Sequence, residues 1–413
     1  MTVPILVYRD QLLPRSETFI PRQYRAFTRL APLWIGTKKG PGAAMIEGKS
    51  QLLGTPLQQM AFKQWGRIPG DAFGLANYAP RLIHAHFGRG GALALPLARH
   101  FQIPLVVSFW GGDATKQSHY RRRPLLPTIY QRRFQALQAE AALFICVSAF
   151  IRDVLVDRGF PPEKLSVLHS GIDVSKPLPA APPDITKLLF VGRLVEKKGV
   201  ALLIEAVARL RPRHPTLTLD IIGDGPLRSD LERQARAVGN INFLGWQSND
   251  EVQERMREAG ILVVPSLIAR DGDAEGLPTV IVEAMAAGCV VVASKSAGIA
   301  EAVISEKTGL LFPAGKVEAL VARLDEVLAS RARWENLREA ARRRAESDFE
   351  AGTQSRRLEE MLIERLPSPR RLPSPPHRFA AGPPLSRFAG EGAERREAGE
   401  GSQQILVIKL SAL

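Results

Sequence analysis

Two glutamates, Glu275 and Glu283, flank a glycine-proline turn that opens a short apolar helix, expected over residues 279–287. The first turn of such a helix has unpaired backbone N–H groups, which attract an anion such as a phosphate. The two carboxylates would repel a phosphate, so they are better suited to accept hydrogen bonds from the neutral hydroxyls of a sugar or a ribose. The ligand that this combination implies is a nucleotide-sugar. The alternative is a solvated helix end, on which such glutamate pairs occur by chance.

A second group of polar residues follows the strand expected at residues 187–191. Gly192 lets the backbone turn, and Arg193 and Lys198 project near the start of the next helix. A bidentate guanidinium and a compact ammonium beside a helix N-terminus can together hold a diphosphate. Basic residues after a strand are also common without any such role, so the segment alone leaves both interpretations open.

A glycine-rich turn, Gly-Asp-Gly-Pro, runs from Gly223 to Pro226 after the next expected strand. It contains Gly-x-Gly, but Arg228 stands where a dinucleotide fingerprint needs its third glycine, so NAD binding is disfavoured. Farther along, Asp271 and Asp273 form an Asp-Gly-Asp sequence that could be taken for a metal-binding motif.

The composition of the 413-residue chain fits two or three globular domains, since 45% of the residues are hydrophobic and 24% are charged. No apolar run approaches the length of a membrane-spanning helix, and the N-terminus lacks the residue order of a signal peptide, so we expect a cytoplasmic protein. Cys146 and Cys289 lie in apolar, strand-like runs and are expected to be buried, reduced thiols.

The formal net charge of +14 calls for an anionic partner: nucleic acid, an anionic membrane surface or a phosphorylated substrate. No nucleic-acid-binding module is recognisable, so nucleic acid is not expected. The densest basic patch, residues 119–134, mixes arginines with Tyr, Leu and Phe. Such a patch is typical of a peripheral contact with the inner face of an anionic membrane, or equally of a solvated helix face.

Short apolar strands alternate with amphipathic helices along most of the chain, which predicts an α/β fold with two doubly wound parallel sheets. Ligands bind at the carboxyl ends of the strands in such sheets, which places the site in the cleft between two domains. The expected strands are residues 4–8, 33–36, 81–86, 104–109, 142–147 and 164–169 in the first half, and 187–191, 216–222, 241–245, 261–265 and 290–293 in the second.

The domain boundaries follow from changes in composition. A proline-rich stretch after Asp173 indicates a linker, and the Pro-, Gly-, Arg- and Glu-rich end of the chain indicates disorder. The predicted organisation is an N-terminal domain at 1–172, a linker at 173–186, a C-terminal domain at 187–345, a further helix at 346–365 and a disordered tail at 366–413, whose last nine residues, ILVIKLSAL, have the pattern of a strand.

The segment from Asp271 to Ser294 resembles the Glu-x7-Glu element of retaining glycosyltransferase family 4, through its EGLP loop, EAMAAG helix and VVVAS strand. That family has the GT-B fold, in which two Rossmann-like domains face a cleft and a return helix crosses back to the first domain. The resemblance covers residues 1–365 and includes GRLVEKKG, from Gly192, and the Gly-Asp-Gly-Pro turn. No metal is expected, because in that family arginine, lysine and a helix dipole neutralise the charge.

The resemblance implies that Arg193 and Lys198 stabilise the leaving diphosphate, that Glu275 holds donor-sugar hydroxyls and that Glu283 holds the ribose diol. Arg193, Lys198 and Glu275 are the implied catalytic residues. The implied donor-binding set adds Gly192, Gly223, Gly225, Gly276, Leu277, Pro278, Thr279 and Glu283. The donor would be a UDP-, GDP- or ADP-sugar, and no further cofactor is required.

The acceptor side resembles the exopolysaccharide and lipopolysaccharide branches of the family through SETFI at residues 16–20 and IHAHFGRGG at residues 83–91. The sequence SFWGGDA at residues 108–114 departs from the family, which usually has histidine at the position of Trp110. A tryptophan cannot shuttle a proton, but it can stack on a sugar and donate one hydrogen bond. The acceptor-side candidates are Ser16, Glu17, Thr18, His86, Trp110, Gly111 and Asp113.

The function that follows is a retaining glycosyltransferase that moves a sugar from a nucleotide diphosphate sugar to a hydroxyl of a cell-surface glycan or lipid-linked acceptor. One alternative is a catalytically impaired paralogue that binds nucleotide-sugar and acts as a partner subunit, motivated by Trp110. Another is a nucleotide-sugar epimerase or a phosphorylase on the same fold.

Overall fold

Two parallel β-sheets organise the computed structural model, which describes residues 2–14, 17–120, 127–179 and 183–367. These residues all belong to one compact unit, Met1–Ser368. The first sheet has the order β5-β3-β1-β6-β7-β8-β9. Its strands are β1 (Val3–Tyr8), β3 (Leu30–Gly36), β5 (Lys49–Leu52), β6 (Ile83–His86), β7 (Leu105–Phe109), β8 (Leu143–Cys146) and β9 (Leu165–Val167).

The second sheet has the order β12-β11-β10-β13-β14-β15, and its strands also pair in parallel. In the register of β10 and β11, Val191 lies opposite Ile222, so the carboxyl ends of these two strands meet at one edge. The strands are β10 (Asp184–Val191), β11 (Thr218–Ile222), β12 (Ile241–Gly245), β13 (Ala259–Val264), β14 (Val290–Lys295) and β15 (Leu310–Pro313). A small pair, β2 (Gln11–Leu12) and β4 (Lys38–Lys39), lies outside both sheets.

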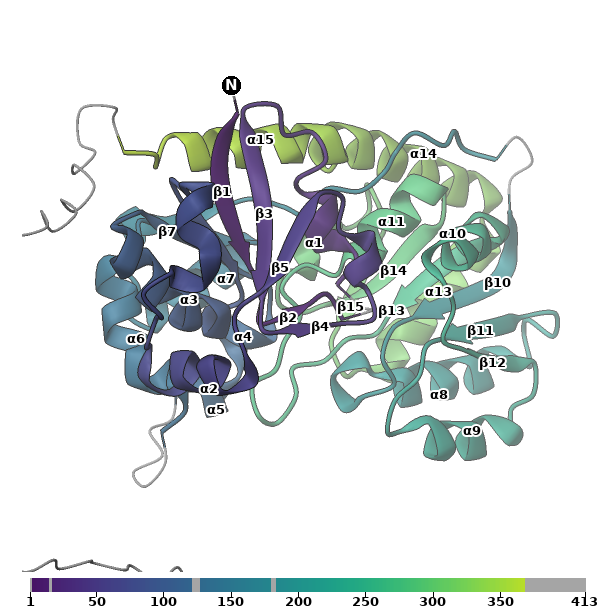
Figure 1. The fold of residues 1–413 in the computed structure, drawn as a ribbon. Helices are drawn as coiled ribbons and strands as arrows, with labels where there is room; N and C mark the ends of the chain where they lie inside the picture. The colour runs from purple at the N-terminus through teal and green to yellow at the C-terminus, as the bar shows by residue number, and fades with distance from the viewer. Residues whose placement is uncertain (1, 15–16, 121–126, 180–182, 368–413) are drawn as a thin grey trace, which may run out of the picture. The chain divides into compact units, whose positions relative to one another are not determined.

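Helices connect the strands and cover the sheets (Figure 1). In the first half these are α1 (Phe19–Arg22), α2 (Pro56–Trp65), α3 (Gly88–Phe101), α4 (Gly112–Thr115), α5 (Gln117–Tyr120), α6 (Ile129–Glu140) and α7 (Ala149–Asp157). In the second half they are α8 (Val200–Leu210), α9 (Arg228–Arg236), α10 (Asn249–Glu258), α11 (Thr279–Ala287), α12 (Ile299–Ala302), α13 (Val317–Ala329), α14 (Arg331–Asp348) and α15 (Ala351–Ile363). Short 3₁₀ helices are Ala43–Met45, Ala72–Tyr78, Pro162–Lys164 and Glu196–Lys198.

The expected strands all occur, with ends shifted by a few residues. Strand β10 begins at Asp184, inside the stretch predicted as a linker, because its first residues pair with β13. Helix α14 continues to Asp348, and α15 begins only at Ala351. Strands β5 and β15 were not expected. Ser16 and the tail from residue 368, with its strand-like end, lie outside the described residues, and the domain division stays a prediction.

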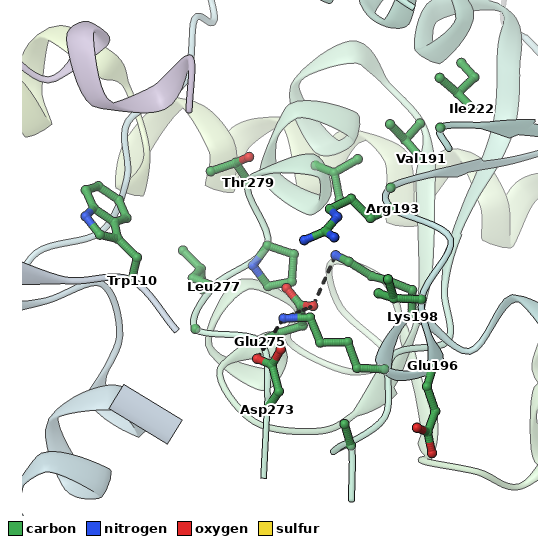
Figure 2. A pocket seen from close by; sticks show the side chains of 18 of the residues that line it. Trp110, Val191, Arg193, Glu196, Lys198, Ile222, Asp273, Glu275, Leu277 and Thr279 are labelled. Carbon is green, nitrogen blue, oxygen red and sulfur yellow. Dashed lines mark hydrogen bonds and ion pairs between the residues drawn. The ribbon is translucent and has the colours of Figure 1, made fainter. Parts of the chain in front are cut away.

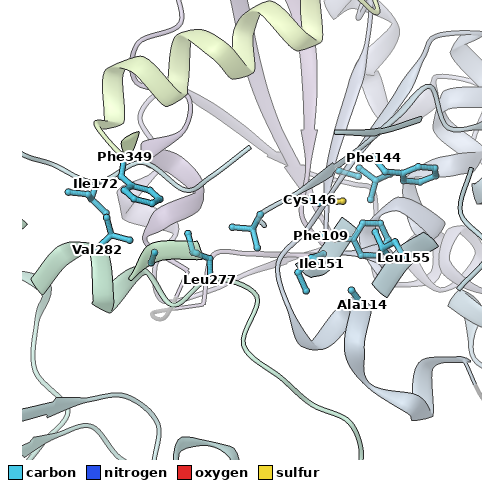
Figure 3. Packing of buried hydrophobic residues seen from close by; sticks show 14 of the residues in the cluster. Phe109, Ala114, Phe144, Cys146, Ile151, Leu155, Ile172, Leu277, Val282 and Phe349 are labelled. Atoms are coloured by element: carbon cyan, nitrogen blue, oxygen red, sulfur yellow. The ribbon is translucent and has the colours of Figure 1, made fainter. Parts of the chain in front are cut away.

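The largest apolar core runs through both halves of the chain. Phe109, Phe144 and Ile151 pack in the first half, and the same cluster continues to Leu277 and Val282 in the second (Figure 3). Because this one cluster contains residues of both sheets, it holds the two halves of the described chain together.

Helix α15 returns the end of the described chain to the first half. Leu358 and Leu362 are fully buried in a core cluster with residues of β1 and β3. Glu359 is 2% exposed and accepts hydrogen bonds from the backbone N–H groups of Thr28, Arg29 and Leu30 at 2.7–2.9 Å. The predicted return helix therefore contacts the first sheet.

Both cysteines are buried and free, as expected, and burial raises the pKa of each thiol to about 12. Within the described ranges, no helix combines the length and the apolar character needed to cross a membrane.

Candidate functional site

A cavity of about 850 Å³ lies between the two halves, beside the carboxyl ends of β10 and β11 (Figure 2). The predicted donor-binding residues all line it except Gly225. Residues from the first half, among them Phe19 and Trp110, complete the wall. The structure thus brings together side chains that the sequence separates by more than a hundred residues.

Two glycine turns form the floor of the cavity. Gly223 has a φ of +133°, and a Cβ atom there would lie 2.0 Å from the carbonyl oxygen of Gly192. Only glycine therefore allows the two βα turns to pack backbone against backbone. The turn after β10 carries Arg193, which is exposed and pairs with no carboxylate of the described residues, so its guanidinium is free for a ligand.

Glu275 lies opposite two ammonium groups. Its Oε1 atom is 3.1 Å from Nζ of Lys198 and 3.4 Å from Nζ of Lys197. Burial alone would raise the pKa of Glu275, but Lys198 and Lys197 outweigh it, and the net pKa is lowered. Glu275 is therefore a carboxylate that can accept hydrogen bonds from hydroxyls.

The ion pairs around Lys197 extend to a residue of the first half of the chain. Asp273 binds Lys197 through Oδ1 at 3.0 Å and Lys116, at the end of α4, through Oδ2 at 3.1 Å. Burial lowers the pKa of Lys197, but Glu275 and Asp273 outweigh this effect and raise it overall. The second carboxylate of the Asp-Gly-Asp sequence is thus paired with two lysines, while Asp271 accepts a hydrogen bond from the backbone N–H of Asp273 at 2.9 Å. No cluster of three or more His, Cys, Asp or Glu residues in the described part of the chain is arranged to hold a metal.

Helix α11 points its N-terminus at the cavity. Pro278 precedes the helix, no side chain caps its first turn, and Thr279 and Val280 of that turn line the cavity. Glu283 follows one turn later, and Arg22 of α1 lies 3.5 Å from it across the cleft. Burial raises the pKa of Glu283, against the opposing effect of Arg22.

Trp110, one of the acceptor-side candidates, lines both the large cavity and a second cavity of about 360 Å³. Its ring lies 4.5 Å from that of Phe19 and stacks on His86 at 5.9 Å. A Cβ atom on Gly276 would lie 2.0 Å from the carbonyl oxygen of Trp110, so the loop that carries Glu275 and this turn touch through their backbones. The tryptophan is therefore a wall shared by the two cavities.

Asp113 shapes the turn that holds Trp110. Its carboxylate accepts hydrogen bonds from the backbone N–H groups of Gly88, Trp110 and Gly111 at 2.9–3.1 Å. Burial raises its pKa against the effect of these N–H groups. Asp113 and Gly111 both line the second cavity.

The remaining acceptor-side candidates lie apart from the large cavity. His86 is fully buried, accompanies His84 in a hydrogen-bonded group around the Tyr24 hydroxyl, and lines neither cavity. Glu17 is ion-paired with Arg9 at 2.6 Å, and Thr18 lines a separate cavity near α10. Ser16 is outside the described residues.

Several polar residues of the site were not singled out from the sequence. Lys197 carried no signal that separated it from Lys198. Arg22 and Lys116 act through partners far away in the chain, as does Glu301, which lines none of the cavities described above. Glu301 of α12 accepts hydrogen bonds from the N–H groups of Ala149 and Phe150, at the start of α7, at 2.7 and 2.8 Å.

Comparison with known proteins agrees with this geometry. The chain matches the sequence model of Glycosyl transferases group 1 over residues 175–344 and that of Glycosyltransferase Family 4 over residues 52–176. It is 34% identical over 298 residues to the amylovoran biosynthesis glycosyltransferase AmsK of Erwinia amylovora, covering 70% of this chain and 71% of that protein. It is 30% identical over 306 residues to the glycogen synthase of Mycobacterium tuberculosis, covering 71% and 72%.

A solved structure has a similar arrangement of the backbone. Alr3699/HepE of Anabaena in complex with UDP-glucose superposes with a TM-score of 0.71 at 20% identity, covering 87% of this chain and 99% of that one.

Proposed function

Because this chain belongs to the family 4, group 1 glycosyltransferases and has the GT-B fold, we propose that it transfers a sugar, with retention, from a nucleotide diphosphate sugar to a hydroxyl of a cell-surface glycan or lipid-linked acceptor. The observation that carries the proposal is the single cavity that gathers Arg193, Lys198, Glu275, Glu283 and the N-terminus of α11. Two of its relatives support the acceptor class, since their names refer to amylovoran and colanic acid biosynthesis.

The diphosphate would lie between Arg193, Lys198 and the first turn of α11. Arg193 has no carboxylate partner among the described residues, and the Lys198 ammonium faces the same space (Figure 2). The packed glycine turns fix the backbone around Arg193, and the first turn of α11 is part of a formed helix, so these positive groups are already gathered where negative charge develops on the leaving diphosphate. They would stabilise the transition state more than the ground state.

The sugar and the ribose would contact the two glutamates. Glu275 accepts hydrogen bonds from donor-sugar hydroxyls, while Glu283, one helical turn into α11, accepts them from the ribose diol. Trp110 would close the sugar site from the acceptor side.

The reaction needs no protein nucleophile. The acceptor hydroxyl attacks C1 of the donor sugar from the face that the diphosphate leaves, so the bond from C1 to the phosphate oxygen breaks while a new C1–O bond forms on the same face. The hydroxyl proton passes to an oxygen of the leaving diphosphate. The products are the glycoside, with its anomeric configuration retained, and a nucleoside diphosphate.

A thermal-shift screen of UDP-, GDP- and ADP-sugars tests the donor site. A donor present at a hundred times its dissociation constant should stabilise the fold by about 2.7 kcal/mol. The Arg193→Met variant should lose most of the shift. The Arg209→Met variant should keep it, because Arg209 pairs with Glu205 and Glu318 outside the cavity. If none of these donors shifts the wild-type melting point, the assignment of the donor site is wrong.

The anomeric configuration of the product, read by NMR, tests retention. An inverted product would contradict the proposed same-face attack. Turnover in this assay would also contradict the alternative that the chain is an impaired paralogue, which binds the donor but does not transfer its sugar.

A further inference from the structure

Helix α2 has an apolar face that points to solvent. Leu57 is 71% exposed, Met60 49% and Trp65 64%, whereas Phe62, on the opposite face, is fully buried. At 100° per residue, these three exposed side chains fall on one side of the helix together with Ala61 and Gln64. Surface helices normally show the reverse pattern, with their apolar stripe inward, whereas Leu57, Met60 and Trp65 belong to none of the apolar clusters of the described chain.

The surroundings of this face are basic. The sequence has no Asp or Glu from residue 48 to residue 70. The guanidinium of Arg67 lies 6.0 Å from the centre of the Trp65 ring. From α6, Arg132 donates a hydrogen bond to Gln64 at 3.0 Å, which places another positive charge beside the helix. The exposed apolar face therefore has a positively charged margin.

We propose that the exposed face of α2 docks on the surface of an anionic phospholipid bilayer. Leu57, Met60 and Trp65 would enter the boundary between headgroups and acyl chains, and the surrounding arginines and lysines would bind the phosphates. A second copy of the chain fits this face less well. In a twofold dimer formed through α2, the basic margin of one copy would face the basic margin of the other. Residues 48–70 contain no Asp or Glu that could pair with these charges.

This surface differs from the basic patch predicted at residues 119–134. Residues 121–126 of that patch lie outside the described residues. In α6, Arg133 turns inward and donates a hydrogen bond to the carbonyl oxygen of Ala92 at 2.9 Å, and burial lowers its pKa. The apolar contact is thus assigned to α2, which lies at the lower edge of the first half in Figure 1, and α6 contributes Arg132 to the margin.

Co-sedimentation of the full chain with lipid vesicles tests the proposal without any donor or acceptor, so its outcome is independent of the proposed reaction. The wild type should bind vesicles of phosphatidylglycerol and phosphatidylcholine in equal parts, and hardly bind pure phosphatidylcholine. Its binding should weaken as salt screens the charges. The double variant Leu57→Gln, Trp65→Gln should bind at least about tenfold more weakly, since two large apolar side chains no longer leave water.

The control is Ile268→Gln, which removes a side chain that is 60% exposed in the second half of the chain and should bind as the wild type does. Thermal unfolding should be unchanged in the double variant, because both replaced side chains are exposed. The proposal is overturned if the wild type ignores anionic vesicles or if the double variant binds them equally well. It is also overturned if light scattering shows a wild-type dimer that the double variant abolishes, since α2 would then be a contact between copies.

Discussion

Lys197 and Lys198 are neighbours in the sequence but have different partners in the donor cavity. Lys197 is held between Asp273 and Glu275, whereas Lys198 pairs with Glu275 and with no other carboxylate of the described residues. Lys198 is therefore freer to turn to a diphosphate. We expect Lys198→Met to lower kcat/KM for transfer by about 10² to 10³, the usual loss when one preorganised stabilising group is removed.

The matched variant for this prediction is Lys197→Met, which should cost clearly less, because that lysine is held by Asp273 as well as by Glu275. Steady-state kinetics with one donor and one acceptor measures both. Equal losses in the two variants would contradict the assignment of Lys198 to the leaving group.

The ion pair between Arg22 and Glu283 predicts a pH-dependent stability. Burial raises the pKa of Glu283, and Arg22 opposes this. A carboxyl whose pKa is raised by folding contributes stability that is fully present below its pKa in the unfolded chain, about 4.3. This stability is lost as the pH rises through its pKa in the folded protein. Arg22→Met should raise this pKa further and lower the free energy of unfolding by about 3 kcal/mol at pH 7, because a buried charge loses its partner.

Denaturant titrations at pH 7 and pH 5 measure this effect, and the deficit of Arg22→Met should shrink at the lower pH. Arg25→Met removes an exposed pair with Glu47 and should change the stability by less than about 1 kcal/mol at both. If the loss of unfolding free energy in Arg22→Met were larger at pH 5 than at pH 7, the stabilising role of Arg22 would not be to pair with the Glu283 carboxylate.

At this scale the sequence allowed Arg193, Lys198 and Glu275 to be predicted, because each follows a strand or opens a helix in a local pattern. It could not reveal Arg22 as a partner of Glu283, since the two residues are 261 positions apart and only the fold brings them together. Trp110 was recognisable as a departure, but its place between two cavities depends on the backbone contact with Gly276.

Helix α7 is the element whose start depends on the opposite half of the chain. Burial would raise the pKa of Glu301, but His169 and the N–H groups of Phe150 and Ala149 outweigh it and lower the pKa. The stability from this contact is therefore present above about pH 4.3 and lost as the pH falls. Glu301→Ala should lower the free energy of unfolding by about 2 kcal/mol at pH 7, as expected for hydrogen bonds to a charged group.

Denaturation of Glu301→Ala beside Glu254→Ala, which removes an exposed carboxylate near Lys176, measures the difference. The Glu301 deficit should diminish below pH 5. If the two variants were equally stable at pH 7, the contact with α7 would contribute nothing.

Among the elements, buried parallel strands were predictable because both faces are covered and their sequences read as apolar runs, as in LVVSF of β7. Strand β5, with the sequence KSQL, was not, because it is a mostly exposed strand at the edge of its sheet. Helix α2 has three large apolar residues, Leu57, Met60 and Trp65, on the outside and only Phe62 buried, so periodicity alone would have assigned the wrong face to the core.

For the whole molecule, the contact of α15 with the first sheet predicts where the chain can be shortened. A chain that ends at residue 367 should keep the melting temperature of the full chain, because it retains α15. A chain that ends at residue 349 should melt more than about 5 °C lower or fail to fold, because Leu358, Leu362 and Glu359 are removed from their buried positions. Thermal scans by circular dichroism compare the two, and equal melting temperatures would show that α15 is dispensable.

The bond between Glu359 and the backbone of residues 28–30 also sets an order of events during synthesis. A ribosome adds about 5 to 20 residues per second, so roughly 15 to 65 s separate the emergence of these two segments. Throughout that interval the newly made first sheet has neither the carboxylate nor the two leucines that complete its core. The N-terminal half of this enzyme must therefore wait for almost the last described helix before it reaches its final stability.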